Sequence, residues 1–482
     1  MKRLPHLILL ASLLLSPCAA EDSEKSEVYS PPVYNITLPA ELQLMPGQPV
    51  LSPSEITPVT LDEAVELSLN AHEDLTQAQA AVAQAVARVA QSRAAAQPQI
   101  SARVSHTKPL YFNTAIPAGL STGPDLGALA FFTNAAEGPS ESLTISQLLY
   151  DFNRTRSAVK AAESRVEASK HAMEATRHQL MYEVSRSYLA LLQSQNLADV
   201  QLLSVENQAL HVEEARQLHK SGLGLPIDVV RAQTEYANAV QQYTETRNQA
   251  LTDRVALAAL MGIDPRTPYA VTEPGAPHPL ETQLDDLVQQ ALANRPGLLQ
   301  SKALVEAQKF SIENARAGNR PRLSTSLSFN ASQVLPQPRS ENLSLMLNLE
   351  IPIFDGGLAR AQTEEAEAGL VSAQAQLSQL QRQVIQEVTN AYIQRQTAAQ
   401  RLRNVEYEVA GAKESVRVAS GRYRLGLGRF IEVLDAERAL ATARTNQVNA
   451  QTQLRQAHAA LKLAVGDAVL SKSITPRPQE KP

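Results

Sequence analysis

The sequence has few large rings and almost no cysteine. Tryptophan is absent, aromatic residues make up 4% of the 482 residues, and Cys18 is the single cysteine. A compact globular core of this length normally uses more aromatic side chains, whereas small cores between long, thin elements need fewer. A single cysteine also excludes an intramolecular disulfide. The composition therefore favours long elements packed side by side.

Long apolar runs are missing as well. Beyond residue 20 there is no stretch of about 18 apolar residues, the length that a transmembrane helix requires. If the chain spans a membrane, it must therefore do so with strands. The formal net charge is −5, and no basic run indicates nucleic-acid binding. These absences exclude a helical membrane protein and disfavour a nucleic-acid-binding one.

Motifs of catalysis are equally scarce. The nine histidines are scattered, without the spacing to carboxylates or cysteine that a metal site needs. No glycine-rich phosphate-binding loop is present, and the carboxylates beside His72 do not form a catalytic constellation. We therefore predict no enzymatic activity, no cofactor and no metal site.

The first residues have the pattern of an export signal. Lys2 and Arg3 precede a short apolar run at 7–15, and small residues follow at a cleavage position. We expect residues 1–20 to be removed. The alternatives are a retained anchor and a lipid attached to Cys18.

The rest of the chain contains one unit twice. Matched positions, each 204 residues apart, are Tyr150 with Phe354, Glu183 with Glu387, Tyr188 with Tyr392, Gly222 with Gly426, and Gly262 with Gly466. At the junction before the long helix, Phe152 and Asn153 of the first repeat replace Gly356 and Gly357 of the second. The junction of the first repeat is therefore expected to be less flexible. The predicted organisation is a signal at 1–20, a Pro/Ser-rich segment at 21–59, repeats at 60–270 and 271–468, and a tail at 469–482.

Each unit is predicted to contain a helix, two strands, a very long helix and another helix. The first helix is expected at 61–97, after a capping box of Thr60 and Glu63. The long helix begins near Asn153 and meets no glycine or proline until Gly222, a span of roughly 100 Å. The two shorter helices, stacked end to end, would match that length. A soluble coiled-coil rod is the alternative.

Four segments alternate apolar and polar residues, as strands with two different faces do. They are 100–105, 143–146, 323–332 and 343–351. Alternating segments of about ten residues are typical of transmembrane barrels, and a soluble sheet covered by helices is the alternative. Four strands cannot close a barrel, about eight leave a filled interior, and twelve leave room for a lumen. Three chains would supply twelve strands, so we expect a trimer.

Three ordered motifs in the second repeat form a familiar pattern. Residues 351–357 lie at the strand-to-helix junction, 423–428 at the helix turn, and 431–436 directly after it. With the duplicated layout over about 60–468, they resemble the TolC family of outer-membrane efflux and secretion proteins. The resemblance implies a mainly α chain with a transmembrane β part. Long helices would form an α-barrel tunnel, and four strands per chain would contribute to a 12-stranded trimeric β-barrel.

The resemblance also implies a setting and partners. It places a homotrimer in the outer membrane of a Gram-negative bacterium, among outer-membrane lipid, with its tunnel extending into the periplasm. A periplasmic membrane-fusion adaptor would open the channel, and an inner-membrane pump of the RND or ABC type would supply the energy. No cofactor and no nucleic acid is implied. The rival interpretation is a periplasmic coiled-coil adaptor or structural protein.

Two acidic residues gain a role from the resemblance. Glu432 and Asp435 match the family's acidic residues that face the lumen at the periplasmic constriction, and their spacing places both on one helix face. In a trimer they would form two carboxylate rings that favour cations. Without the resemblance, they could equally be solvated surface carboxylates.

Other residues near the two turns complete the expected gate. Asp228 and Arg231 stand where the second repeat has Glu432 and Asp435, and this asymmetry predicts ion pairs between neighbouring hairpins. Arg429 is the nearest match to the family's basic latch, so an Arg429–Asp228 pair is a hypothesis. The turns are expected to dock the adaptor, although glycine also simply permits a tight reversal. The turn residues with this expected role are Gly222, Gly224, Gly426 and Gly428.

Overall fold

The computed structural model describes residues 57–108, 138–275, 282–333 and 338–467. The expected signal at 1–20, Cys18 and the predicted tail at 469–482 lie outside the described residues. So does almost all of the predicted Pro/Ser-rich segment.

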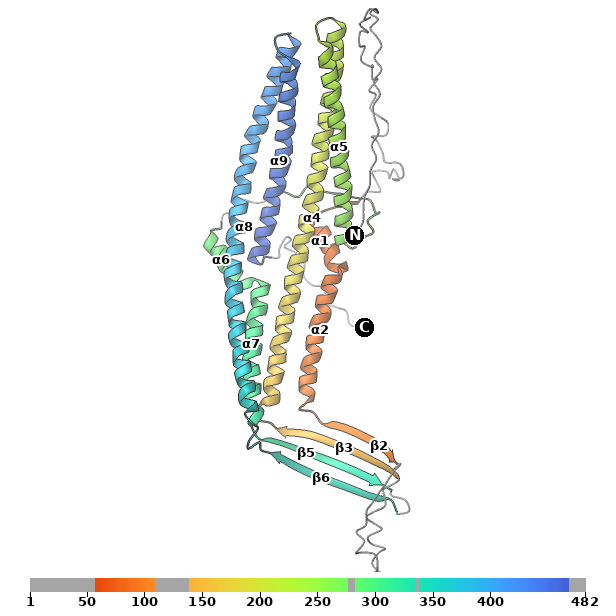
Figure 1. The fold of residues 1–482 in the computed structure, drawn as a ribbon, viewed down its shortest axis with the longest axis vertical. Coiled ribbons are helices and arrows are strands. Elements are labelled where there is room, and N and C mark those ends of the chain that lie inside the picture. The colour runs from red at the N-terminus through yellow and green to blue at the C-terminus, as the bar shows by residue number, and fades with distance from the viewer. Residues whose placement is uncertain (1–56, 109–137, 276–281, 334–337, 468–482) are drawn as a thin grey trace, which may run out of the picture. The chain divides into compact units, whose positions relative to one another are not determined.

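The same order of elements occurs twice along the described chain (Figure 1). The helices of the first repeat are α1 (Leu61–Ala71), α2 (Glu73–Ala94), α4 (Arg154–Lys220) and α5 (Pro226–Leu260). Those of the second are α6 (Leu284–Asn294), α7 (Pro296–Arg316), α8 (Leu358–Arg424) and α9 (Phe430–Val465). Both α4 and α8 have 67 residues, as the repeat predicts. Among the described residues, no helix combines the length and apolar character needed to cross a membrane.

The single helix expected at 61–97 is wrong, because the chain forms two helices there. His72 adopts an extended conformation (φ −76°, ψ 133°), and its Nδ1 accepts a hydrogen bond from the Asp74 amide at 3.3 Å, which starts α2. Arg295 has the equivalent conformation in the second repeat, where the following Pro296 disfavours the helical region. The predicted capping box is present, with both Thr60–Glu63 hydrogen bonds formed.

Helix α4 has neighbours along its whole length. It packs against α5 and α9 in one part and against α1, α2 and α7 in the other. The shorter helices α5 and α2 therefore succeed one another beside α4, which confirms the expected end-to-end stacking (Figure 1). Helix α8 packs against α9, α7 and α6 in the corresponding way.

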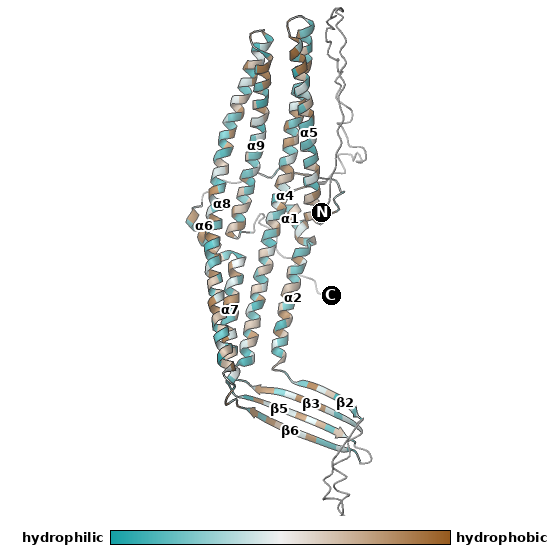
Figure 2. Ribbon diagram, in the orientation of Figure 1, coloured by the Kyte–Doolittle hydropathy of each residue, from teal (hydrophilic) through white to brown (hydrophobic). Residues whose placement is uncertain are grey.

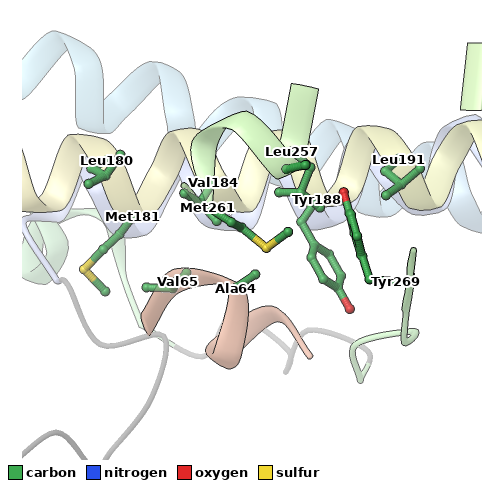
Figure 3. Close-up of a cluster of buried hydrophobic side chains, with 11 residues drawn as sticks. Ala64, Val65, Leu180, Met181, Val184, Tyr188, Leu191, Leu257, Met261 and Tyr269 are labelled. Carbon is green, nitrogen blue, oxygen red and sulfur yellow. The ribbon is translucent and has the colours of Figure 1, made fainter. Parts of the chain in front are cut away.

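A small core lies where the shorter helices of the first repeat meet α4 (Figure 3). It packs Leu180 and Val184 of α4 against Val65 of α1 and Leu257 of α5. Beside it, strand β1 (Thr57–Val59) pairs in parallel with β4 (Tyr269–Val271). The core members are Ala64, Val65, Leu180, Met181, Val184, Tyr188, Leu191, Leu257, Ala258, Met261 and Tyr269.

Tyr188 connects that core to the strand pair. Its hydroxyl lies 2.9 Å from the carbonyl oxygen of Val59 and 2.6 Å from that of Thr272, and it accepts from the Thr272 amide at 2.9 Å. One side chain of α4 thus bonds both β1 and the residue after β4. A second core, in the equivalent place of the other repeat, packs Leu287 and Leu298 against Val384 and Val388 of α8.

The four remaining strands form one antiparallel sheet with the order β2-β3-β5-β6. The strands are β2 (Gln99–Thr107), β3 (Gly138–Tyr150), β5 (Arg322–Ser332) and β6 (Ser340–Glu350). Strand β3 is much longer than the alternation at 143–146 predicted. The two repeats meet at β3 and β5, and the outer edges of β2 and β6 have no strand partner among the described residues.

Candidate functional site

The sheet has one apolar and one polar face. Residues directly opposite each other in antiparallel strands share a face. The register pairs Ile100 with Ile145, Ile145 with Leu327, and Leu327 with Leu345. On the other face it aligns Ser101, Thr144, Ser328 and Ser344. The alternation predicted for these strands is therefore confirmed in three dimensions (Figure 2).

The apolar face is open in the single chain. Val104 is 76% exposed and Leu345 is 77% exposed. A set of exposed apolar side chains this large on one face of a sheet marks a surface that another apolar medium or chain covers. The exposed large apolar residues of this face are Ile100, Val104, Leu143, Leu327, Leu343, Leu345, Leu347 and Leu349.

The junctions from sheet to long helix have the same geometry despite different residues. Phe152 and Asn153 have φ of 52° and 68°, and Gly356 and Gly357 have 66° and 88°. A left-handed conformation is strained for phenylalanine. The first junction therefore follows the same backbone path as the second, but with a conformational strain that glycine avoids.

An aspartate follows the strand at both junctions and caps the helix. Asp355 accepts from the amides of Ala359 at 2.8 Å and Gly357 at 2.9 Å. These hydrogen bonds, the one from Ala359 first, hold the pKa of Asp355 below its ordinary value. Asp151 accepts from the Thr155 amide at 2.8 Å in the equivalent place.

The two helix turns also repeat one geometry. Gly222 and Gly426 have φ of 79° and 71°, which only glycine adopts readily. The amides of Leu223 and Gly224 both donate to the Leu218 carbonyl oxygen at 2.9 Å, which closes the end of α4. The turns present four exposed leucines, namely Leu223, Leu225, Leu425 and Leu427.

A cleft between the two turns brings the predicted latch residues together. Asp228 and Arg231 of α5 and Arg429 before α9 all line it. Within the described chain, no ion pair joins Arg429 to Asp228, so the Arg429–Asp228 pair stays a prediction for neighbouring hairpins of an assembly. Tyr423 of α8 lies on the same cleft, and its buried hydroxyl has no hydrogen-bond partner among the described residues.

Burial determines the chemistry of that tyrosine. Burial first, and then the negative charges of Asp228 and Glu214, raise the pKa of Tyr423 to about 12. The ring packs against Phe430 with centroids 5.1 Å apart. The cleft therefore has a neutral aromatic floor beside charged groups.

Glu432 and Asp435 lie at the start of α9, and both are exposed. Glu432 Oε2 is 3.6 Å from Arg422 Nη1, and Asp435 Oδ1 is 3.4 Å from Arg438 Nη1. Exposed pairs at such distances are weak. Both carboxylates therefore remain available to solvent and ions, although arginines stand near them.

Sequence reasoning missed a set of polar contacts between the two hairpins. His211 of α4 lies 3.3 Å from Glu437 of α9, and Arg438 of α9 bonds Glu235 of α5 at 2.5 Å. These partners are more than 200 residues apart, so no local spacing indicates them. No group of three or more His, Cys, Asp or Glu side chains in the described part of the chain could hold a metal ion.

Comparison with known proteins gives a consistent picture. The family model described as "outer membrane efflux protein" matches residues 64–263 and 287–467, one segment in each repeat. Outer membrane protein OprJ of Pseudomonas aeruginosa is 28% identical over 325 residues, which cover 65% of this chain and 67% of OprJ. Outer membrane protein TolC of Vibrio cholerae is 24% identical over 336 residues, which cover 66% of this chain and 76% of TolC.

A solved structure shares the fold. The outer membrane protein VceC of Vibrio cholerae superposes with a TM-score of 0.69 at 21% identity. The match covers 84% of this chain and 96% of VceC. The duplicated arrangement of long helices and a four-stranded sheet is therefore a fold that this chain shares with VceC.

Proposed function

Because this chain belongs to the outer membrane efflux protein family, we propose that it is one subunit of a passive exit duct of the outer membrane. The resemblance to the TolC family is confirmed, and the protein is a transport protein of the outer membrane. The duct would be the last stage of a tripartite efflux or type I secretion system. It needs no cofactor and carries out no catalysis.

The two-faced, four-stranded sheet with free edges carries this proposal. An open sheet edge is not stable in lipid, because each unpaired backbone group costs several kcal/mol there. Among the described residues, strands β2 and β6 have such edges, and four strands are too few to close on themselves. Three copies would pair each β6 with the β2 of a neighbour. The twelve strands would then present the leucine face to lipid and the serine face to a lumen.

The helical part would continue the duct into the periplasm. Helices α4 and α8, with 67 residues each, extend for roughly 100 Å, well beyond a bilayer of about 45 Å. The exposed leucines of the two turns would dock a periplasmic adaptor. An inner-membrane pump of the RND or ABC type would drive transport, since the duct is passive.

The residues near the turns would form the resting gate. Glu432 and Asp435 would contribute two rings of carboxylates at the narrow end, where a negative ring favours cations. Arg429 would pair with Asp228 between neighbouring hairpins, and Arg231 would add a second basic group there. Support comes from the cleft that Asp228, Arg231 and Arg429 line together, and from the exposure of both α9 carboxylates.

Membrane fractionation followed by planar-bilayer recording tests the proposal. The protein should fractionate with the outer membrane, and the purified protein should produce discrete, cation-preferring conductance steps. A periplasmic coiled-coil adaptor, the rival interpretation, would appear in the soluble periplasmic fraction and produce no steps. That result would reject the duct.

A further inference from the structure

A buried histidine connects the two helical hairpins close to their turns. His211 of α4 is 7% exposed, and its Nε2 lies 3.3 Å from Oε1 of Glu437 in α9, which is itself 9% exposed. Its Nδ1 lies 3.5 Å from Oε2 of Glu214, one turn further along α4. We call these three residues the His211 cluster. Its imidazole lies between carboxylates from helices of different repeats.

Helix α8 adds positive charge next to the cluster. Arg424 Nε donates to Glu214 Oε1 at 2.8 Å. Arg417 lines a second cleft together with His211, Glu214 and Glu437, but both of its hydrogen bonds go to Glu414 on its own helix. One guanidinium therefore acts on the cluster directly.

Helices α5 and α9 contribute the remaining charged and aromatic groups. Glu235 of α5 bonds Arg438 of α9, and Asp228 of α5 acts on Tyr423. The Phe430 ring closes the cluster toward the turns, with its centroid 6.4 Å from that of His211. Because these groups bond or act elsewhere, the charged groups around the imidazole are two carboxylates and one guanidinium.

Protonation of the imidazole changes this balance. A neutral imidazole donates one hydrogen bond and leaves the other nitrogen as an acceptor, which here faces a second carboxylate. That nitrogen, Nδ1, has no hydrogen-bond partner in the described part of the chain. An imidazolium donates from both nitrogens and brings the charge of the cluster and Arg424 to zero. The protonated form can therefore donate to both carboxylates, whereas the neutral form can donate to only one.

We propose that the His211 cluster is a proton-sensitive contact that holds α4 and α9 together beside the periplasmic opening. The inference rests on the proposed function, since it assigns a control to the gate of that duct. Separation of the hairpins would return His211 and both glutamates to water. An imidazolium is attracted to both carboxylates at once only while the hairpins are together. Acid therefore favours the closed arrangement, and a higher pH weakens this attraction.

The contact occurs once in each chain. The positions equivalent to His211 and Glu437 in the repeat are Ser415 and Gln233, which cannot titrate in this range. The pH response should therefore depend on one histidine, and a single substitution should remove it.

Bilayer recording of the full-length protein at pH 5 and pH 8 tests this. Resting conductance of the wild type should be about tenfold lower at pH 5, a size typical of a coupling between two sites. His211→Gln keeps a polar side chain but cannot be protonated, so its change should be less than twofold. His171→Gln, on the same helix and outside the cluster, should behave as the wild type does. A wild-type pH response retained in His211→Gln would overturn the proposal.

A second variant and a second readout keep the test decisive. Glu437→Gln should also lose most of the pH response, and it decides the matter if His211→Gln misfolds. Nitroxide labels at Leu210 of α4 and Ala439 of α9, in a Cys18→Ser background, should report a shorter distance at pH 5 than at pH 8. An unchanged distance contradicts the inference. This distance can be measured even if no conductance is found, so a failure of the duct and a failure of the switch are distinguishable.

Discussion

Helices α4 and α8 occupy equivalent places in the two repeats, yet they are buried very differently. They have the same length, but nineteen residues of α4 are buried within the chain and only nine of α8 are. In the described part of the chain, helix α4 packs against five other helices, whereas α8 packs against three. Since the sequence repeat makes the two helices equivalent, the neighbours that α8 lacks should come from another copy of the chain.

Individual positions make the difference plain. Leu189 and Met181 of α4 are 4% and 9% exposed, and their equivalents Ile393 and Ile385 of α8 are 53% and 40% exposed. In a trimer, α5 and α2 of a neighbour would cover α8 as α9 and α7 cover α4. The same neighbour would complete the sheet at the free edge of β6.

The largest expected effect comes from a charge on this open face. Ile393→Glu should reduce the trimer fraction at least tenfold while each chain stays folded, because assembly would bury an unpaired carboxylate. Leu189→Glu, at the equivalent place in α4, should instead prevent folding of the chain itself. Native mass and circular dichroism separate these outcomes, with Ile393→Val as the matched control. A trimeric Ile393→Glu variant would contradict the prediction that a neighbouring copy covers α8 at this position.

The asymmetry between the two turns predicts a second effect. Arg429→Ser should raise the resting conductance several-fold, because it removes the basic partner proposed for Asp228. Combined substitution of Glu432→Gln and Asp435→Asn should lower the preference for cations. Bilayer recording measures both, and Arg266→Ser, remote from the turns, is the control. An unchanged resting conductance in Arg429→Ser would count against the latch.

A smaller effect should distinguish the two equivalent tyrosines. Tyr188→Phe removes the hydroxyl that bonds Val59 and Thr272, so it should cost about 1–3 kcal/mol of unfolding free energy. The hydroxyl of Tyr392 makes no such bond among the described residues, and Tyr392→Phe should change stability by less than about 0.5 kcal/mol. Guanidinium unfolding in detergent compares them. Equal losses would show that the Tyr188 hydroxyl contributes no more stability than the Tyr392 hydroxyl does.

The smallest effect is expected at Tyr423, whose position in the first repeat is taken by His219. Its buried hydroxyl has no partner, so Tyr423→Phe should be neutral or slightly stabilising at pH 7. Because the folded pKa is raised to about 12, the folded state keeps a proton that the unfolded state has released above about pH 10. Wild-type stability should therefore fall between about pH 10 and 12. A Tyr423→Phe variant with the same alkaline loss, measured by thermal unfolding, would contradict this.

Much of the fold follows from patterns within single segments. Period-two alternation located the four strands of the sheet, and uninterrupted helical sequence located α4 and α8. The family was also evident from ordered motifs at the junction and the second turn. These features depend on neighbours along the chain, which the sequence shows directly.

The remaining features depend on contacts across the repeats or on unusual backbone. No proline indicates the helix break at His72, whereas Pro296 indicates the equivalent break in the second repeat. Phe152 and Asn153 adopt the glycine-like path of the other junction, which their side chains do not favour. The contact of His211 with Glu437 joins residues more than 200 positions apart. None of these features has a local sequence signal strong enough to predict it.

The most direct test of the central claim is the native mass of the protein extracted from outer membranes in mild detergent. If neighbouring copies cover α8 and complete the sheet, the protein mass will equal three chains. A stable, folded monomer that needs no detergent would contradict the account, because its β2 and β6 edges and the open face of α8 would then have no partner.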